Sequence, residues 1–193
     1  DEFARIERPE VLNALAKLLG VSDFLWDDFL RMQYSNLFPI VRDVNTLEKA
    51  FNRKDLEKEA QKAVSKTAHW REGLNAFKDR EMFRIDMRHI LGYTAEFGTF
   101  SEELTDLVEV ILGEAFKHCK QELVKQYGQP RLENHQPSEA VLLALGKCGG
   151  RELGFASDIE LMLVYSGQGK TGGFKSIATS NFYEELIQSL LQA

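Results

Sequence analysis

Two acidic side chains, Asp158 and Glu160, stand at the start of an apolar run, 159–165, that has the length and composition of a β-strand. Side chains two apart in a strand project to the same face, so these carboxylates are expected side by side. Two carboxylates held this close repel each other unless a cation lies between them. Such oxygen ligands suit Mg²⁺, which keeps several waters and takes further ligands from substrate phosphates. The pair therefore predicts a magnesium site.

A glycine-bearing turn, with Gly146, Gly149 and Gly150, lies upstream and follows another apolar run, 141–145. Residues without a Cβ let backbone N–H groups approach a phosphate closely. Taken alone, the D-x-E pattern is better explained as a pair of surface acids on a strand edge, because short motifs match often by chance. The upstream glycines and the flanking strands reverse that preference, and together they favour metal-dependent nucleotidyl transfer.

The chain that precedes this stretch is helical by pattern. Apolar residues recur at helical spacing, and the many charges of 46–79 are interpreted as a solvated helix face. Thr99 and Glu102 predict a capping box at the start of the longest helix, and Gly128 its end. The other predicted helices cover 9–20, 22–32 and 80–91, the last of them ending at Gly92.

The composition changes at 129–138, where two prolines and several polar residues predict a linker. We therefore expect a helical domain over 1–130 and a second, truncated domain over 131–193. The second domain has two predicted strands and a final helix, capped by Ser180 or Asn181. Two strands alone leave apolar surface and edges unpaired, so further strands, or a partner that supplies them, are expected.

The GQGKTGG segment, 167–173, invites comparison with a phosphate-binding P-loop. That motif requires glycine where Val164 stands, and a helix that starts at the lysine, here Lys170. Neither requirement is met, and we interpret the segment as a flexible loop. The four histidines are scattered, and no catalytic histidine is assigned. Cys119 and Cys148 lack metal-ligand spacing and are expected to be free thiols.

Composition narrows the class of protein. The chain has 193 residues, of which 44% are hydrophobic, so a folded protein is expected. Its net charge of −6 argues against a general nucleic-acid binder, which usually carries a basic excess. No apolar run approaches the roughly 20 residues needed to span a membrane. These features predict a cytoplasmic protein that binds neither nucleic acid nor membrane.

The stretch ALGKCGGRELGFASDIELMLVY closely resembles the signature of the glutamine synthetase adenylyltransferase/adenylyl-removing enzyme family, in which G-K-L-G-G-R-E-L leads into S-D-I-D-L. VSDFLWDDFLRMQYSNL, FRIDMRHILGY and LTDLVEVILGEAFKHC are similar to helical segments of that family. GKTGGFKSIATSNFYEELIQSLL resembles the segment after the second strand, and it favours the N-terminal, adenylyl-removing half. Two residues depart from the pattern: Glu160 replaces an aspartate, which shifts the metal, and Cys148 replaces a leucine.

The resemblance implies an α+β protein, in which a helical domain precedes an incomplete polymerase-β-like nucleotidyltransferase domain. Asp158 and Glu160 would be metal ligands and catalytic residues, and the family carries a third carboxylate on a later strand, beyond Ala193. The residues implied to lie near the nucleotide phosphates are Lys147, Gly149, Gly150 and Ser157. Lys147 and Arg151 could each neutralise phosphate charge, and a surface salt bridge explains each of them equally well.

The implied reaction uses two Mg²⁺ ions in an in-line displacement. Inorganic phosphate would attack the phosphorus of an AMP–tyrosine ester on glutamine synthetase and release ADP, or AMP would pass from ATP to the tyrosine. The implied partners are glutamine synthetase, ATP or ADP, phosphate and a PII-type signalling protein, in a role that regulates nitrogen metabolism. The alternative is a catalytically incomplete module that senses nucleotide or docks a protein.

Overall fold

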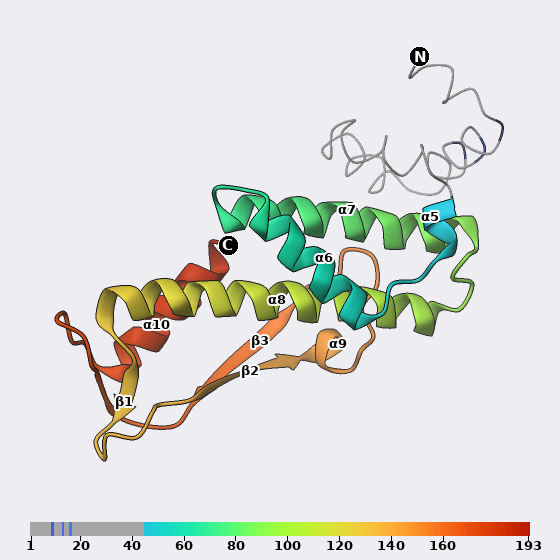
Figure 1. Ribbon diagram of the computed structural model, residues 1–193. Helices are drawn as coiled ribbons and strands as arrows, with labels where there is room; N and C mark the ends of the chain where they lie inside the picture. The colour runs from blue at the N-terminus through green and yellow to red at the C-terminus, as the bar shows by residue number, and fades with distance from the viewer. Residues whose placement is uncertain (1–8, 10–12, 14–15, 17–44) are drawn as a thin grey trace.

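The computed structural model describes residues 9, 13, 16 and 45–193 (Figure 1). Apart from residues 9, 13 and 16, the two helices predicted over 9–20 and 22–32 lie outside the described part of the chain. The elements that follow are, in chain order, α5 (Asn45–Glu48), α6 (Arg53–Ser65), α7 (Trp70–Leu91), α8 (Phe97–Tyr127), β1 (Pro130–Leu132), β2 (Ala140–Leu145), α9 (Gly146–Gly149), β3 (Glu160–Tyr165), β4 (Gly169–Thr171) and α10 (Thr179–Leu191).

Helices α6, α7 and α8 lie next to one another (Figure 1). They pack through apolar side chains. Helix α6 begins after Asn52, whose side chain accepts a hydrogen bond from the Asp55 N–H at 3.1 Å, and Leu56 and Ala60 are its buried residues. No charged side chain between 48 and 79 is buried, which confirms the predicted solvated face. This packing holds α8 in place against α6 and α7.

Helix α7 corrects one predicted boundary, because it begins at Trp70 rather than at Arg80 and ends at Gly92 as predicted. In the stretch before Arg80 the buried residues are only Gly73, Leu74 and Phe77, so the apolar stripe of the sequence is sparse there. Charged side chains are buried further along the helix. Arg84 Nε donates to Glu81 at 2.7 Å, and Arg88 Nε donates to Glu103 of α8 at 3.1 Å. Paired in this way, these charges can lie in the interior.

Helix α8 is the long helix that the sequence predicts, and Gly128, at φ 83°, forms its C-cap. It nevertheless begins at Phe97, so Thr99 lies inside its first turn and the predicted capping box is wrong. The extra turn is held by aromatic packing, since the Phe97 ring lies 5.8 Å from that of Phe100 and 6.2 Å from that of His89. Tertiary contact here overrides the local capping signal.

The strands form two antiparallel pairs, β2 with β3 and β1 with β4. Strand β2 agrees with the predicted run, and β3 begins one residue later than predicted. The predicted linker and the predicted flexible loop are both wrong in part, because 130–132 and 169–171 pair as β1 and β4. Partners this far apart in sequence leave no local signal. Helix α10 begins at Thr179 with Ala178 as its N-cap, so neither Ser180 nor Asn181 caps it.

The helices and strands share their hydrophobic clusters, and the mixture of helix and small sheets agrees with the predicted α+β class. Cys148 and Leu153 belong to a cluster with Leu104 and Leu107 of α8, and α10 contributes Phe182 to a second cluster with Cys119. Both cysteines are buried free thiols, as predicted. No helix among the described residues is both long enough and apolar enough to cross a membrane.

One face of the β2–β3 pair is exposed. The outward side chains alternate with half-buried ones along both strands, as strand geometry requires. The apolar side chains exposed on this face are Val141, Leu143, Leu145, Met162 and Val164. The expectation that further strands or a partner cover this surface stays a prediction.

Candidate functional site

The Glu160 carboxylate lies against the glycine turn. Glu160 is the first residue of β3 and pairs directly with Leu145, the last residue of β2, so its side chain stands beside the start of α9. Gly146 has φ 54°, and a Cβ on it would overlap the Glu160 Oε2 atom. Only glycine therefore satisfies both the left-handed backbone and the close approach of the carboxylate.

Asp158 lies outside the strand, which corrects the expectation that both acids sit on β3. The extended alternation nevertheless holds around it. Ser157 and Ile159 line a cavity beneath the loop, whereas Asp158 is exposed and does not line that cavity. Asp158 and Glu160 are both exposed. That the two carboxylates project to the same side stays a prediction.

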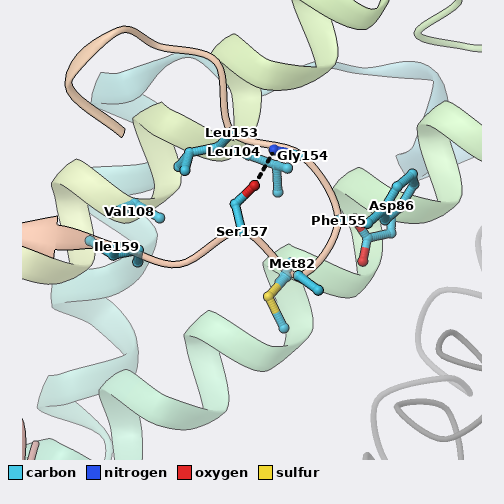
Figure 2. Close-up of a pocket in the computed structure, with 10 residues that line it drawn as sticks. Met82, Asp86, Leu104, Val108, Leu153, Gly154, Phe155, Ser157 and Ile159 are labelled. Carbon is cyan, nitrogen blue, oxygen red and sulfur yellow. Dashed lines mark hydrogen bonds between the residues drawn. The ribbon is translucent and has the colours of Figure 1, made fainter. Parts of the chain in front are cut away.

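The cavity beneath the loop has a volume of about 220 Å³ (Figure 2). Its wall comes from α7, α8 and the loop that leads to β3, and most of the side chains are apolar: Met82, Asp86, Leu104, Val108, Leu153, Gly154, Phe155, Ala156, Ser157 and Ile159. The loop is therefore shaped by apolar contacts on its inner side, while its acids face outward.

Ser157 has a local role in this loop. Its Oγ accepts a hydrogen bond from the Gly154 N–H at 2.9 Å, as Figure 2 shows, and its own N–H donates to the Gly154 carbonyl at 3.2 Å. These two bonds close a tight turn immediately before Asp158. The predicted contact of Ser157 with a nucleotide phosphate stays a prediction. In the structure, Ser157 stabilises the turn before Asp158.

The turn residues differ in whether their polar groups remain free to bind a ligand. A Cβ on Gly149 would overlap the Ala144 carbonyl oxygen, so this glycine lets α9 close onto β2. The Gly150 N–H already donates to the Gly146 carbonyl at 3.0 Å. The Lys147 side chain is exposed and makes no hydrogen bond or ion pair within the described part of the chain. Lys147 is therefore the better placed of these residues to meet a phosphate.

Arg151 forms surface salt bridges, one of its two predicted roles. Its Nη2 donates to Asp106 at 2.6 Å and its Nη1 to Glu109 at 3.1 Å, and both acids lie on α8. The hydrogen bond with Asp106 raises the pKa of the guanidinium. Arg53 of α6 also pairs with Glu109. Asp106 and Glu109 were missed in the sequence, where two acids three residues apart on a helix look like any solvated face.

The donor set at the site suits magnesium. Asp158 and Glu160 supply exposed carboxylate oxygens, and Mg²⁺ is commonly held by one or two carboxylates together with waters and substrate phosphates. No group of three or more His, Cys, Asp or Glu side chains that could hold a metal occurs among the described residues. Asp158 and Glu160 would therefore need further ligands, from waters and a substrate phosphate, to hold the ion.

Comparison with known proteins gives consistent results. The family model for glutamate-ammonia ligase adenylyltransferase matches residues 12–193. The bifunctional glutamine synthetase adenylyltransferase/adenylyl-removing enzyme of Shewanella woodyi is 30% identical over 192 residues, and the match covers 95% of this chain and 20% of that protein. The protein of the same name from Thioalkalivibrio sulfidiphilus is 36% identical over 119 residues, 62% of this chain and 12% of the relative. The chain thus spans a fifth or less of the length of these relatives.

Proposed function

The chain belongs to the glutamate-ammonia ligase adenylyltransferase family, and we propose that it carries the metal-binding part of a nucleotidyltransferase site that acts on glutamine synthetase. The reaction is removal of AMP from a tyrosine by phosphorolysis, or transfer of AMP to that tyrosine. The names of the relatives support the protein substrate, since they describe both an adenylyltransferase and an adenylyl-removing enzyme.

The single observation that carries this proposal is the contact of the Glu160 carboxylate with Gly146. It brings an acid to the start of the glycine turn, where the free Lys147 ammonium is the next side chain along. Acids for a cation and a lysine for a phosphate are the two parts that phosphoryl-type transfer needs in close proximity. This arrangement supports the turn and its two strands as the start of a polymerase-β-like nucleotidyltransferase domain.

Each residue then has a stated task. Asp158 and Glu160 would hold Mg²⁺ through their carboxylate oxygens, and Lys147 would neutralise charge on the nucleotide phosphates. When bound, the ion would supply charge neutralisation for an in-line displacement. In phosphorolysis an oxygen of inorganic phosphate forms a bond to the AMP phosphorus and the phosphorus–tyrosine oxygen bond breaks. The products are ADP and the tyrosine hydroxyl, which takes its proton from the attacking phosphate.

The partners follow from this chemistry. Glutamine synthetase is the protein substrate, and ATP, ADP and inorganic phosphate are the small substrates and products. A PII-type signalling protein is proposed as the regulator on the strength of the sequence resemblance. The function would be the control of nitrogen assimilation.

The test is a titration of ADP and ATP into the wild-type chain and Asp158→Ala, with Mg²⁺ and with EDTA. We expect the Mg²⁺-dependent part of the binding to fall by about tenfold or more in Asp158→Ala, the loss of one charge-assisted ligand. Glu184→Ala is the matched control, because Glu184 is an exposed acid on α10, remote from the turn. Equal Mg²⁺-dependent binding by wild type and Asp158→Ala refutes the metal role of Asp158.

Transfer itself is tested with the protein at its natural length. Adenylylated glutamine synthetase and inorganic phosphate are supplied, and ADP release is measured. We expect Mg²⁺-dependent release that Asp158→Ala abolishes and Glu184→Ala preserves. Absence of release and of the reverse transfer from ATP, alongside intact nucleotide binding, would instead establish a nucleotide-sensing module.

A further inference from the structure

Two cations face each other across the β1–β4 pair. Arg131 of β1 and Lys170 of β4 are directly opposite in the antiparallel register, and both side chains are exposed. Like charges in this position destabilise a sheet. Arg131 Nη1 donates to the His135 carbonyl at 3.0 Å, and neither cation pairs with an acidic side chain in the described part of the chain. A protein of net charge −6 therefore keeps an unbalanced pair of positive charges here.

The same two residues line a hollow of about 720 Å³, which is within the usual size range of small-molecule sites. Glu133 supplies the only carboxylate among the lining residues, against the two cations Arg131 and Lys170. The charge balance of the hollow is positive, which selects an anionic ligand.

Tyr165, the last residue of β3, lines this hollow as well. Its ring stacks on that of Tyr183 with the centroids 4.6 Å apart and 25° between the planes. Tyr183 is 1% exposed, and its hydroxyl donates to the Ser138 carbonyl at 2.9 Å, so the buried ring of the stack is held in place. Tyr165 keeps 38% of its surface exposed, which offers an aromatic surface to a planar base.

The backbone around Lys170 is held by hydrogen bonds to neighbouring segments. The Thr171 N–H donates to the Ile177 carbonyl and the Gly172 N–H to the Gln129 carbonyl, both at 2.9 Å. These bonds fix β4 to the segments on either side of it. A ligand bound between the cations therefore meets a preorganised site, and its negative charge relieves their repulsion.

We propose that this hollow is a second nucleotide-binding site, in which phosphate groups lie between Arg131 and Lys170 and the base stacks on Tyr165. It goes beyond the proposed function, because it uses neither Asp158 nor Glu160 and needs no metal ion. Tyr165 is five residues beyond Glu160 on the same strand, so the two sites are about 16 Å apart at the strand rise. The ligand is a nucleoside phosphate bound by charge and stacking.

The binding test is calorimetric titration of Asp158→Ala in EDTA with ADP, with ATP and with inorganic phosphate. We expect ADP and ATP to bind, more weakly as ionic strength rises, and inorganic phosphate to bind less tightly because it has no base. Arg131→Ala and Lys170→Ala should each lower nucleotide affinity by about tenfold, and Tyr165→Ala by a similar factor. Lys175→Ala is the matched control, an exposed lysine that does not line the hollow.

A second readout separates a ligand site from a structural role. In Lys170→Glu the residue opposite Arg131 becomes its counter-ion, so the melting temperature should stay equal or rise by about 1–2 °C while nucleotide binding is lost. Nucleotide binding that survives in Lys170→Glu overturns the proposal, as does inorganic phosphate binding as tightly as ADP. Because these titrations omit Mg²⁺ and Asp158, their failure leaves the proposed function standing, and failure of the Mg²⁺-dependent test leaves this one intact.

Discussion

Replacing Gly146 by alanine tests whether the position of the Glu160 carboxylate is what makes the site. Gly146 has φ 54°, and an added Cβ would overlap Glu160 Oε2. Gly150 is the matched control for stability in the same turn, since its φ is −80° and the nearest heavy atoms to an added Cβ, Glu152 Cδ and the Gly146 carbonyl oxygen, both lie at 3.5 Å. One substitution therefore displaces the carboxylate, and the other adds the same methyl group into ordinary contact.

The expected cost to stability is modest. An alanine in the left-handed region costs about 1–2 kcal/mol relative to glycine. The clash with Glu160 adds little to this, because the far end of an exposed, flexible side chain can rotate away. We expect Gly146→Ala to lower the free energy of unfolding by about 1–2 kcal/mol and the melting temperature by about 3–6 °C. Gly150→Ala should change it by less than about 1 kcal/mol in either direction.

The functional effect should be larger than the effect on stability. We expect the Mg²⁺-dependent affinity for ATP to fall by about tenfold in Gly146→Ala, because the displaced carboxylate no longer shares a cation with Asp158. Urea unfolding supplies the free energies, and titrations with Mg²⁺ and with EDTA supply the affinities. If Gly146→Ala is destabilised but binds ATP and Mg²⁺ as the wild type does, the contact with Glu160 is not used for metal binding, and the reasoning fails.

Two further predictions concern buried groups. Arg88→Met should lower the free energy of unfolding by about 3–5 kcal/mol, because it leaves the Glu103 carboxylate buried without its guanidinium partner. Thermal unfolding measures this free energy, and a loss below about 1 kcal/mol contradicts the prediction. Burial, followed by the nearby Glu109 carboxylate, raises the pKa of the Cys148 thiol. In a Cys119→Ala background, which leaves Cys148 as the one thiol, native protein at pH 8 should therefore react with a thiol reagent far more slowly than protein unfolded in urea. Equal rates in the two states would show that Cys148 is accessible in the native fold.

The parts of the site that the sequence predicts are those with a local signal. The D-x-E pattern and the glycines mark Glu160 and its turn, and the apolar runs mark β2 and β3 because strand periodicity is local. That Asp158 faces the same way as Glu160 stays a prediction, because the strand begins only at Glu160. The pattern does not show which atom the Glu160 carboxylate contacts, because that depends on how α9 packs onto β2.

The parts that were predicted wrongly depend on long-range contacts. Strand β1 looks like a linker because its partner, β4, lies about forty residues further along, and the pairing alone orders both segments. Likewise, the first turns of α7 and α8 are set by packing rather than by caps. The salt bridges of Arg151 belong to the same class, since Asp106 and Glu109 acquire a role only once the turn rests on α8.

Helix α8 carries neither of the two predicted metal ligands, yet it positions the site. Its 31 residues extend over about 46 Å. Asp106 and Glu109, in its first half, hold Arg151 next to the glycine turn, and at its other end the Tyr127 carbonyl accepts the Gly173 N–H at 2.9 Å. Exposed ion pairs such as these contribute only about 0–1 kcal/mol to stability. Their consequence is therefore geometric, because they hold Arg151 and the glycine turn against the first half of α8. The backbone hydrogen bond of Gly173 holds the segment after β4 at the C-terminal end of the same helix.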